Sequence, residues 1–190
     1  MKFDAQNASI AALIKRYDIG LKTEYKNGKE VLTGAIYALE TRKLKSDNAM
    51  EIIRARKPEI YNYLVDRRNA EIKAAEERQA KIDAIEGLKE LKAARADLAS
   101  WHKEFEKSFD DVGGLGVRSK PNYDLKAMSE KYPRAAAYIK ADAWAYAANF
   151  EKASAGRKAK ERIINGEEPA LVLREMEEEW DEACRSHIWD

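Results

Sequence analysis

The chain has 190 residues, of which 45% are hydrophobic and 36% charged, and its net charge is +1. Charged residues alternate with apolar ones throughout, which favours a helical globular protein over a disordered one, and no run of about 18 apolar residues is present to span a membrane. The single cysteine, Cys184, excludes an internal disulfide. Together with an N-terminus that lacks a secretory signal pattern, it predicts a cytoplasmic location.

The charge is unevenly distributed along the chain. Residues 1–68 carry 14 basic and 9 acidic groups, residues 69–112 carry 8 and 11, residues 113–166 carry 11 and 5, and residues 167–190 carry 2 and 9. Such a polarised chain can attract charged partners. The alternative is that solvated helix faces happen to cluster by sign.

The N-terminal segment predicts a helix followed by a β-hairpin. Residues 5–17 have the apolar spacing of a short amphipathic helix, and residues 19–25 alternate between apolar and polar as a strand does. Asn27-Gly28 is a strong signal for a two-residue type I′ turn, with 30–37 as the returning strand. The alternative for the second strand is a helix that begins between Ala35 and Leu44.

A second short helix is expected over residues 48–56. Ser46-Asp47 offers an N-cap for it. Lys57 precedes Pro58 and is biased away from helical geometry, which predicts a break there.

This first third resembles the N-terminal docking domain of TubC-type synthases. The resemblance rests on Tyr17-Asp-Ile-Gly-Leu, on the Asn27-Gly28 hairpin and on Lys57-Pro-Glu-Ile-Tyr-Asn-Tyr-Leu64, and it implies a protein-docking module. A nucleic-acid-binding module is the competing interpretation, although no clear helix-turn-helix spacing is present. It rests on the basic residues in or beside the predicted helices: Arg42, Lys43, Lys45, Arg54, Arg56, Lys57, Arg67 and Arg68.

The longest uninterrupted helical stretch runs from Pro58 to Phe109. It contains strong helix formers and one glycine, Gly87, which predicts either a break into two helices or a close helix crossing. From Leu91 onward an apolar stripe of helical spacing reaches Phe109. Before Ile82 the stripe is irregular, so a coiled coil and packing against the C-terminal helices both remain open.

The C-terminal third predicts further helices after a glycine-rich loop. Residues 110–122 are expected to form a flexible hinge, and Asp124 caps a short helix. One long alanine-rich helix is expected over 134–164, with its aromatic residues packed inward, and Asn165-Gly166 ends it. The last helix begins at Pro169, and its expected buried side chains are Leu171, Leu173, Met176 and Trp180.

This C-terminal third is similar to small phage and prophage accessory proteins of the anti-CRISPR type, which inhibit a Cas nuclease. The similarity rests on Lys131-Tyr-Pro-Arg-Ala-Ala-Ala-Tyr138, Ala155-Gly-Arg-Lys-Ala-Lys160, Asn165-Gly-Glu167 and Met176-Glu-Glu-Glu-Trp180. It implies inhibition by stoichiometric binding.

Residues with the chemistry of a catalytic or metal site are sparse. Cys184 and His187 form a Cys-x-x-His step, but a structural zinc site normally takes four cysteine or histidine ligands, and no further cysteine is present. His102 lies beside the apolar stripe and is expected to be a partly buried structural residue. We therefore expect no enzyme activity, no cofactor and no metal site.

Two basic segments and one acidic segment are the candidate binding sites. The basic candidates, for nucleic acid or a protein partner, are Arg54, Arg56, Lys57, Arg157, Lys158, Lys160 and Arg162. The acidic candidates, which could imitate nucleic-acid phosphates toward a basic groove, are Glu175, Glu177, Glu178, Glu179, Asp181 and Glu182. The alternative for the basic run of 157–162 is its place near a helix C-terminus, where the dipole favours cations. The alternative for the acidic run is a solvated face that also pairs with this preceding basic segment.

The sequence thus predicts a mainly α protein. It has a small N-terminal α/β module with a β-hairpin (1–66), a long central helix (67–112) and a C-terminal helical bundle (113–190). The expected function is that of a phage-type inhibitory binding protein that blocks a host defence nucleoprotein complex, for example a Cas nuclease with its guide RNA. The alternatives are a nucleic-acid-binding accessory protein and a self-associating structural phage protein.

Overall fold

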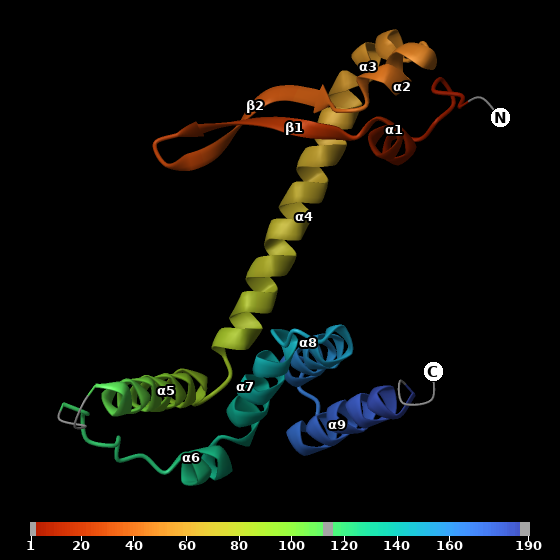
Figure 1. The fold of residues 1–190 in the computed structure, drawn as a ribbon. Coiled ribbons are helices and arrows are strands. Elements are labelled where there is room, and N and C mark those ends of the chain that lie inside the picture. Colours follow the sequence, from red (N-terminus) through yellow and green to blue (C-terminus); the bar gives the residue numbers. More distant parts are fainter. Residues whose placement is uncertain (1–2, 112–115, 187–190) are drawn as a thin grey trace. The chain divides into compact units, whose positions relative to one another are not determined.

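The computed structural model describes residues 3–111 and 116–186 and divides into two compact units, Met1–Glu76 (unit 1) and Glu77–Asp190 (unit 2). This division falls inside a helix, whereas the sequence-based ranges place boundaries near residues 66 and 112. The prediction of a mainly α protein with an N-terminal hairpin is confirmed (Figure 1). The elements are α1 (Ile10–Tyr17), β1 (Ile19–Lys26), β2 (Lys29–Ala38), α2 (Thr41–Ser46), α3 (Met50–Ala55), α4 (Lys57–Asp83), α5 (Leu88–Asp110), α6 (Leu125–Lys131), α7 (Pro133–Ala145), α8 (Phe150–Ile164) and α9 (Pro169–Ser186).

The hairpin of unit 1 forms where the sequence predicts it. β1 and β2 are antiparallel, with Lys26 opposite Lys29, and the turn residues Asn27 and Gly28 have φ of 53° and 75°. Positive φ at both central residues is what a type I′ turn requires. The register shifts between Leu21 and Thr23 of β1, and Gly34 in β2, with φ of 75°, lies in this irregular part.

The core of unit 1 collects one apolar face from each helix around the base of the hairpin. Leu13 and Tyr17 of α1 and Ile60 of α4 are fully inaccessible to solvent. α1 begins later than expected, at Ile10, because the Ser9 hydroxyl accepts a hydrogen bond from the Ala12 backbone N–H and caps the helix there.

The expected cap at Ser46-Asp47 is wrong. α3 begins at Met50 after Ala49, and no side chain caps it. The Asp47 carboxylate instead accepts hydrogen bonds from the Arg16 guanidinium at 3.1 Å and the Tyr17 hydroxyl at 3.2 Å, which tie α1 to the end of α2. A local capping rule cannot anticipate these partners, which lie about thirty residues away in the sequence.

Replacing Asp47 by alanine is expected to lower the unfolding free energy of unit 1 by about 1–3 kcal/mol, because the buried Tyr17 hydroxyl loses its acceptor. Urea unfolding followed by circular dichroism measures this. All four tryptophans lie between Trp101 and Trp189, so tryptophan fluorescence serves as an internal reference that follows unit 2. Asp66→Ala, at an exposed position of α4, is the control; equal stabilities of the two variants would contradict the role given to Asp47.

The predicted long helix is two helices. A turn at Arg56 separates α3 from α4, so the chain breaks one residue before Lys57, where the break was expected, and Lys57 itself begins α4. α4 ends at Asp83, and α5 begins at Leu88. Gly87 precedes α5 with φ of 73°, a left-handed conformation that glycine adopts without strain. Within α4, every residue from 69 to 77 is exposed, including Ile72 at 46%.

Unit 2 is built on the close packing of α7 against α8, followed by α9. The single helix expected over 134–164 is wrong: α7 ends at Ala145, and Asn149 caps α8 by accepting the Lys152 backbone N–H. The chain reverses between them so that Gly156 lies against the backbone of α7, where an added Cβ would be 2.4 Å from the Ala145 nitrogen. Alanines on both helices allow this approach and are buried there: Ala135, Ala137, Ala141, Ala155 and Ala159.

The start of α6 and the end of α8 follow the capping and glycine signals of the sequence. Asp124 caps α6 through the Lys126 and Ala127 N–H groups, and α8 stops at Asn165-Gly166, as predicted. On α9 the buried residues are Pro169, Val172 and Met176. Met176 is buried as expected and Leu173 packs against the core, whereas Leu171, expected to be buried, is 38% exposed. None of the helices described here is both long and apolar enough to cross a membrane.

Part of the segment predicted as a hinge is anchored to α5. The Trp101 indole N–H donates to the Arg118 carbonyl at 2.8 Å, and the Arg118 guanidinium pairs with Asp97 and Glu104. Tyr123 also donates to Asp97, at 2.6 Å. Residues 112–115, which hold Gly113 and Gly114, lie outside the described residues.

Candidate functional site

The basic candidates of unit 1 separate into structural and accessible groups. Arg56 donates to the Ala8 carbonyl at 2.7 Å and pairs with Glu59 at 3.2 Å, so it fixes the start of α4. Arg54 and Lys57 are exposed, and they lie at the edge of an apolar recess.

This recess, the hairpin hollow, has a volume of about 330 Å³. It lies between the base of the hairpin and the helices α2, α3 and α4. Its lining contains two cations, Arg54 and Lys57, and no carboxylate. The residues that line it are Ile19, Ile36, Tyr37, Ala38, Thr41, Leu44, Met50, Ile53, Arg54 and Lys57. An apolar recess with basic residues at its edge suits a ligand that combines an apolar group with negative charge.

Tyr37 is placed at the edge of the hairpin hollow by a glycine on the opposite strand. A Cβ at Gly20 would lie 2.5 Å from the Tyr37 ring and hydroxyl, so the ring rests on the Gly20 backbone. Tyr37 and Met50 are 46% and 42% exposed, which makes them the accessible apolar surface of the hollow. Neither residue was a sequence-based candidate, because their positions become significant only once the hairpin and α3 are packed together.

The basic candidates of α8 have carboxylate partners within unit 2, with one exception. Lys158 pairs with Glu179 and Lys160 with Asp142, both at 2.5 Å, while Arg162 pairs with Glu167 and Glu175. The hydrogen bonds that Arg162 donates to Glu167 and, with a smaller effect, to Glu175 raise the pKa of its guanidinium above the usual range. The exception within the described residues is Arg157, whose guanidinium lies over the ring of Phe150, 5.9 Å from the ring centre.

Lys160 is the most enclosed of these cations, with a side chain only 14% exposed. Burial disfavours its charged form, but the hydrogen bond to Asp142 and the neighbouring Tyr138 and Tyr146 outweigh burial, so its pKa is raised. Its ammonium group lies 5.4 Å and 5.8 Å from the centres of these two rings. Lys160 is therefore held as a fixed positive charge.

The acidic candidates of α9 are largely engaged with the protein's own bases. Glu175 pairs with Arg162, Glu177 with Lys140 and Glu179 with Lys158. Glu178 lies 3.7 Å from Arg174, an exposed pair on the same helix, and Asp181 and Glu182 are exposed near its end. The structure thus brings the basic run of α8 and the acidic run of α9 together, while the basic candidates Arg54, Arg56 and Lys57 lie in unit 1.

Arg157, Lys158 and Lys160 line a second recess, the basic hollow, whose volume is about 540 Å³. Its other lining residues are Arg78, Ala145, Tyr146 and Glu161. The sequence did not identify Arg78, because it lies some eighty residues before α8 on a different helix. Tyr146 and Phe150, expected to pack inward, are 81% and 74% exposed because they flank the break between α7 and α8.

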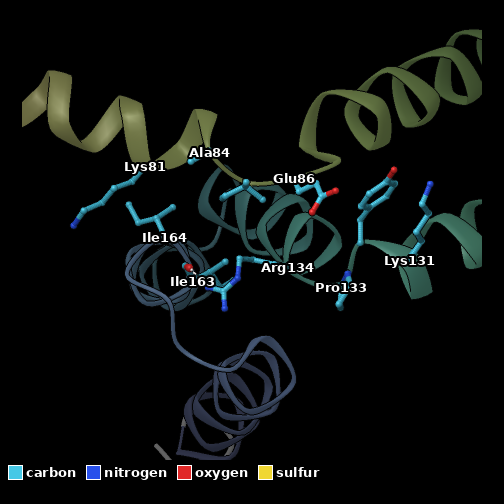
Figure 2. A pocket seen from close by; sticks show the side chains of 10 residues that line it. Lys81, Ala84, Glu86, Lys131, Pro133, Arg134, Ile163 and Ile164 are labelled. Carbon is cyan, nitrogen blue, oxygen red and sulfur yellow. Dashed lines mark hydrogen bonds between the residues drawn. The ribbon is translucent and has the colours of Figure 1, made fainter.

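A third recess, of about 420 Å³, lies where α4 and α5 meet the ends of α6 and α8 (Figure 2). Its polar groups serve the fold. Arg134 donates to the Ile163 and Gly166 carbonyls at the end of α8, and Lys81 donates to the Asn165 side chain. The Lys131 ammonium lies over the Tyr132 ring, 4.9 Å from its centre. Lys81, Arg134 and Lys131 are therefore engaged within the fold, and Glu86 is the remaining charged residue of the lining.

The residues considered for metal or acid–base chemistry do not converge. His102 is exposed rather than partly buried, and the centre of its ring lies 4.9 Å from the centre of the Trp101 ring. Cys184 is half-buried on α9, whereas His187 lies outside the described residues. Among the residues described, no three His, Cys, Asp or Glu side chains are grouped as metal ligands.

The candidate sites are therefore two recesses, an apolar one with a basic edge in unit 1 and a basic one with exposed aromatics in unit 2. In comparisons with known proteins, no protein-family model, no curated protein and no solved structure matches the chain.

Proposed function

We propose that this protein is a non-catalytic binding protein that acts by stoichiometric association with a partner protein. The hairpin hollow is the observation that carries the proposal. Its apolar lining, its exposed Tyr37 and Met50, and its two cations suit a protein segment with one large apolar side chain and acidic neighbours.

The two features of the hollow have separate roles in this association. An apolar anchor buried in a recess supplies much of the affinity of a typical interface. Arg54 and Lys57 have no carboxylate beside them in the lining, so acidic residues of the partner would complement them and fix its orientation. The proposed site thus uses two of the three basic candidates of unit 1, while Arg56 supports the fold.

The proposed biological setting is that of a phage-type inhibitor in the cytoplasm of a host cell, which covers a surface of a host defence nucleoprotein complex such as a Cas nuclease with its guide RNA. The C-terminal resemblance supports this setting. Because Glu175, Glu177 and Glu179 already have basic partners, the proposal assigns partner contact to the hairpin hollow rather than to α9.

Self-association along α4 is less well supported. A coiled coil needs an apolar seam that repeats every three to four residues. The exposed part of α4, residues 69–77, contains one large apolar residue, Ile72. This favours association with a different protein over pairing of two copies through α4.

Reversal of both charges at the hollow, Arg54→Glu with Lys57→Glu, is expected to reduce partner recovery by more than about tenfold, because two attractive contacts become repulsive. The tagged protein is used to capture partners from a bacterial lysate that contains a Cas nuclease–guide complex, with and without added nuclease, and the proteins are identified by mass spectrometry. Lys26→Glu with Lys29→Glu, at the hairpin turn, changes the net charge equally and is the control.

Retention of one protein partner after nuclease treatment, by the wild type and the control variant but not by the charge-reversed variant, supports the proposal. Loss of every protein partner with nuclease treatment would contradict it. Equal retention by all three proteins would show that the hairpin hollow is not the contact.

A further inference from the structure

The basic hollow of unit 2 has the composition of a site for an anionic, aromatic polymer. Four cations line it, Arg78, Arg157, Lys158 and Lys160, against one carboxylate, Glu161. Two exposed aromatic side chains, Tyr146 and Phe150, lie at or beside it.

The α8 helix explains why these side chains gather on one surface. Phe150, Arg157 and Glu161 are separated by seven and four residues, so they project from the same face of the helix. Lys158 and Lys160 flank this face. Arg78 reaches it from α4 through hydrogen bonds of 2.8 Å and 2.5 Å to Glu161.

The carboxylates nearby leave the cations available to a ligand. Glu161, Glu179 and Asp142 pair with Arg78, Lys158 and Lys160. The Arg78 and Lys158 pairs are solvent-exposed, and exposed ion pairs contribute little to stability because water screens them. A phosphate can therefore exchange for either carboxylate at small cost. Arg157 can bind a phosphate without giving up a carboxylate partner, because within the described residues its guanidinium lies over the Phe150 ring, 5.9 Å from the ring centre.

The exposed aromatics distinguish among possible anionic partners. Tyr146 is 81% and Phe150 74% exposed, so their ring faces can receive another planar group. Single-stranded nucleic acid presents both matching features, since bases stack on aromatic rings while phosphates bind arginine and lysine. A duplex keeps its bases stacked internally and would leave the two rings without a partner, and an acidic protein surface would use only the cations.

We propose that the basic hollow binds single-stranded nucleic acid, with phosphates on Arg157, Lys158 and Arg78 and a base stacked on Tyr146. This site lies in a different unit from the hairpin hollow and does not depend on the function proposed above. The protein thereby has one site for protein and one for nucleic acid, and variants of each can be tested separately.

Fluorescence anisotropy with a fluorescein-labelled oligothymidylate of about 12 nucleotides, a length within the range bound by single-strand sites, tests this proposal on the full chain. The logarithm of the association constant is expected to fall with the logarithm of salt concentration with a slope near −2, as about three neutralised phosphates would give. Arg157→Ala is expected to make this slope shallower by about 0.7.

Tyr146→Ala is expected to weaken binding by about tenfold and leave the salt slope unchanged, because stacking on a base releases no counterions. Tyr25→Ala, at an equally exposed tyrosine of unit 1, and Lys126→Ala, at an exposed lysine of α6, are the matched controls and are expected to bind as the wild type does. All four substituted side chains are exposed, so each variant is expected to fold, which circular dichroism verifies.

Three results would overturn the proposal. The first is no anisotropy change at low salt, and the second is an equal effect of the control and site substitutions. The third is a wild-type dimer that Tyr146→Ala converts to a monomer in sedimentation without any change in oligonucleotide binding, which would make this surface an interface between copies of the chain.

Discussion

Replacing Gly156 by alanine is expected to lower the unfolding free energy of unit 2 by about 2 kcal/mol, although alanine is the better helix former by about 1 kcal/mol. The new Cβ would lie 2.4 Å from the Ala145 nitrogen, 2.7 Å from the Trp144 carbonyl carbon and 2.8 Å from the Ala141 oxygen. These are backbone atoms of α7, so no side chain can rotate away and α8 has to shift. Urea unfolding followed by tryptophan fluorescence measures the loss.

Ala143→Gly calibrates this result. Ala143 is exposed on α7, so its replacement changes helix propensity without changing a packed contact and is expected to cost about 1 kcal/mol. If Gly156→Ala instead stabilises unit 2 by a similar amount, propensity dominates, and the close approach of α7 and α8 is wrong.

Replacing Gly87 by alanine is expected to destabilise unit 2 by about 2–4 kcal/mol for two reasons that add. The φ of 73° places an alanine in the left-handed region, at a cost of about 1–2 kcal/mol. The added Cβ would also lie 2.2 Å from Cγ of Tyr132, at the base of the ring, where rotation of the side chain gives little relief. Thermal and urea unfolding by tryptophan fluorescence measure the total effect.

A double-mutant cycle with Tyr132→Ala separates the two causes. In the background without the ring, Gly87→Ala is expected to cost only the conformational part, about 1–2 kcal/mol. An unchanged cost in both backgrounds would show that Tyr132 does not contact Gly87 closely.

Local signals in the sequence were sufficient for features whose causes are local. Asn27-Gly28 specified the hairpin turn because both residues tolerate positive φ, and Asp124 specified the start of α6 because its carboxylate reaches N–H groups two and three residues ahead. The break near Gly87 was foreseen as one of two possibilities, and the φ of 73° at that residue explains why a break formed.

Features that depend on distant contacts were not predictable. Asp47 looked like a helix cap but binds Arg16 and Tyr17. The break between α7 and α8 contains neither glycine nor proline, and its one usable signal was Asn149, a good N-cap followed by an acidic residue. That break exposes Tyr146, so the aromatic part of the proposed nucleic-acid site escaped detection.

The candidate charges show the same division. Arg157, Lys158 and Lys160 were identified as a basic run, but sequence distance hid Arg78, which the fold brings to within 2.8 Å of Glu161. Likewise the acidic run of α9 suggested an exposed surface, whereas three of its carboxylates neutralise bases of the same unit. Charge runs locate candidate groups, and only packing determines which of them remain available to a ligand.

The exposed stretch of α4, residues 69–77, has a consequence for how the sequence can drift. None of its side chains is buried, so packing places no constraint on the size or shape of these side chains. Substitutions among alanine, glutamate, lysine, glutamine and arginine would change the helix propensity of this stretch by only a few tenths of a kcal/mol each. Selection on this segment is therefore expected to act on its helicity, on its charge balance and on ion pairs such as Arg67–Glu71, rather than on side-chain shape.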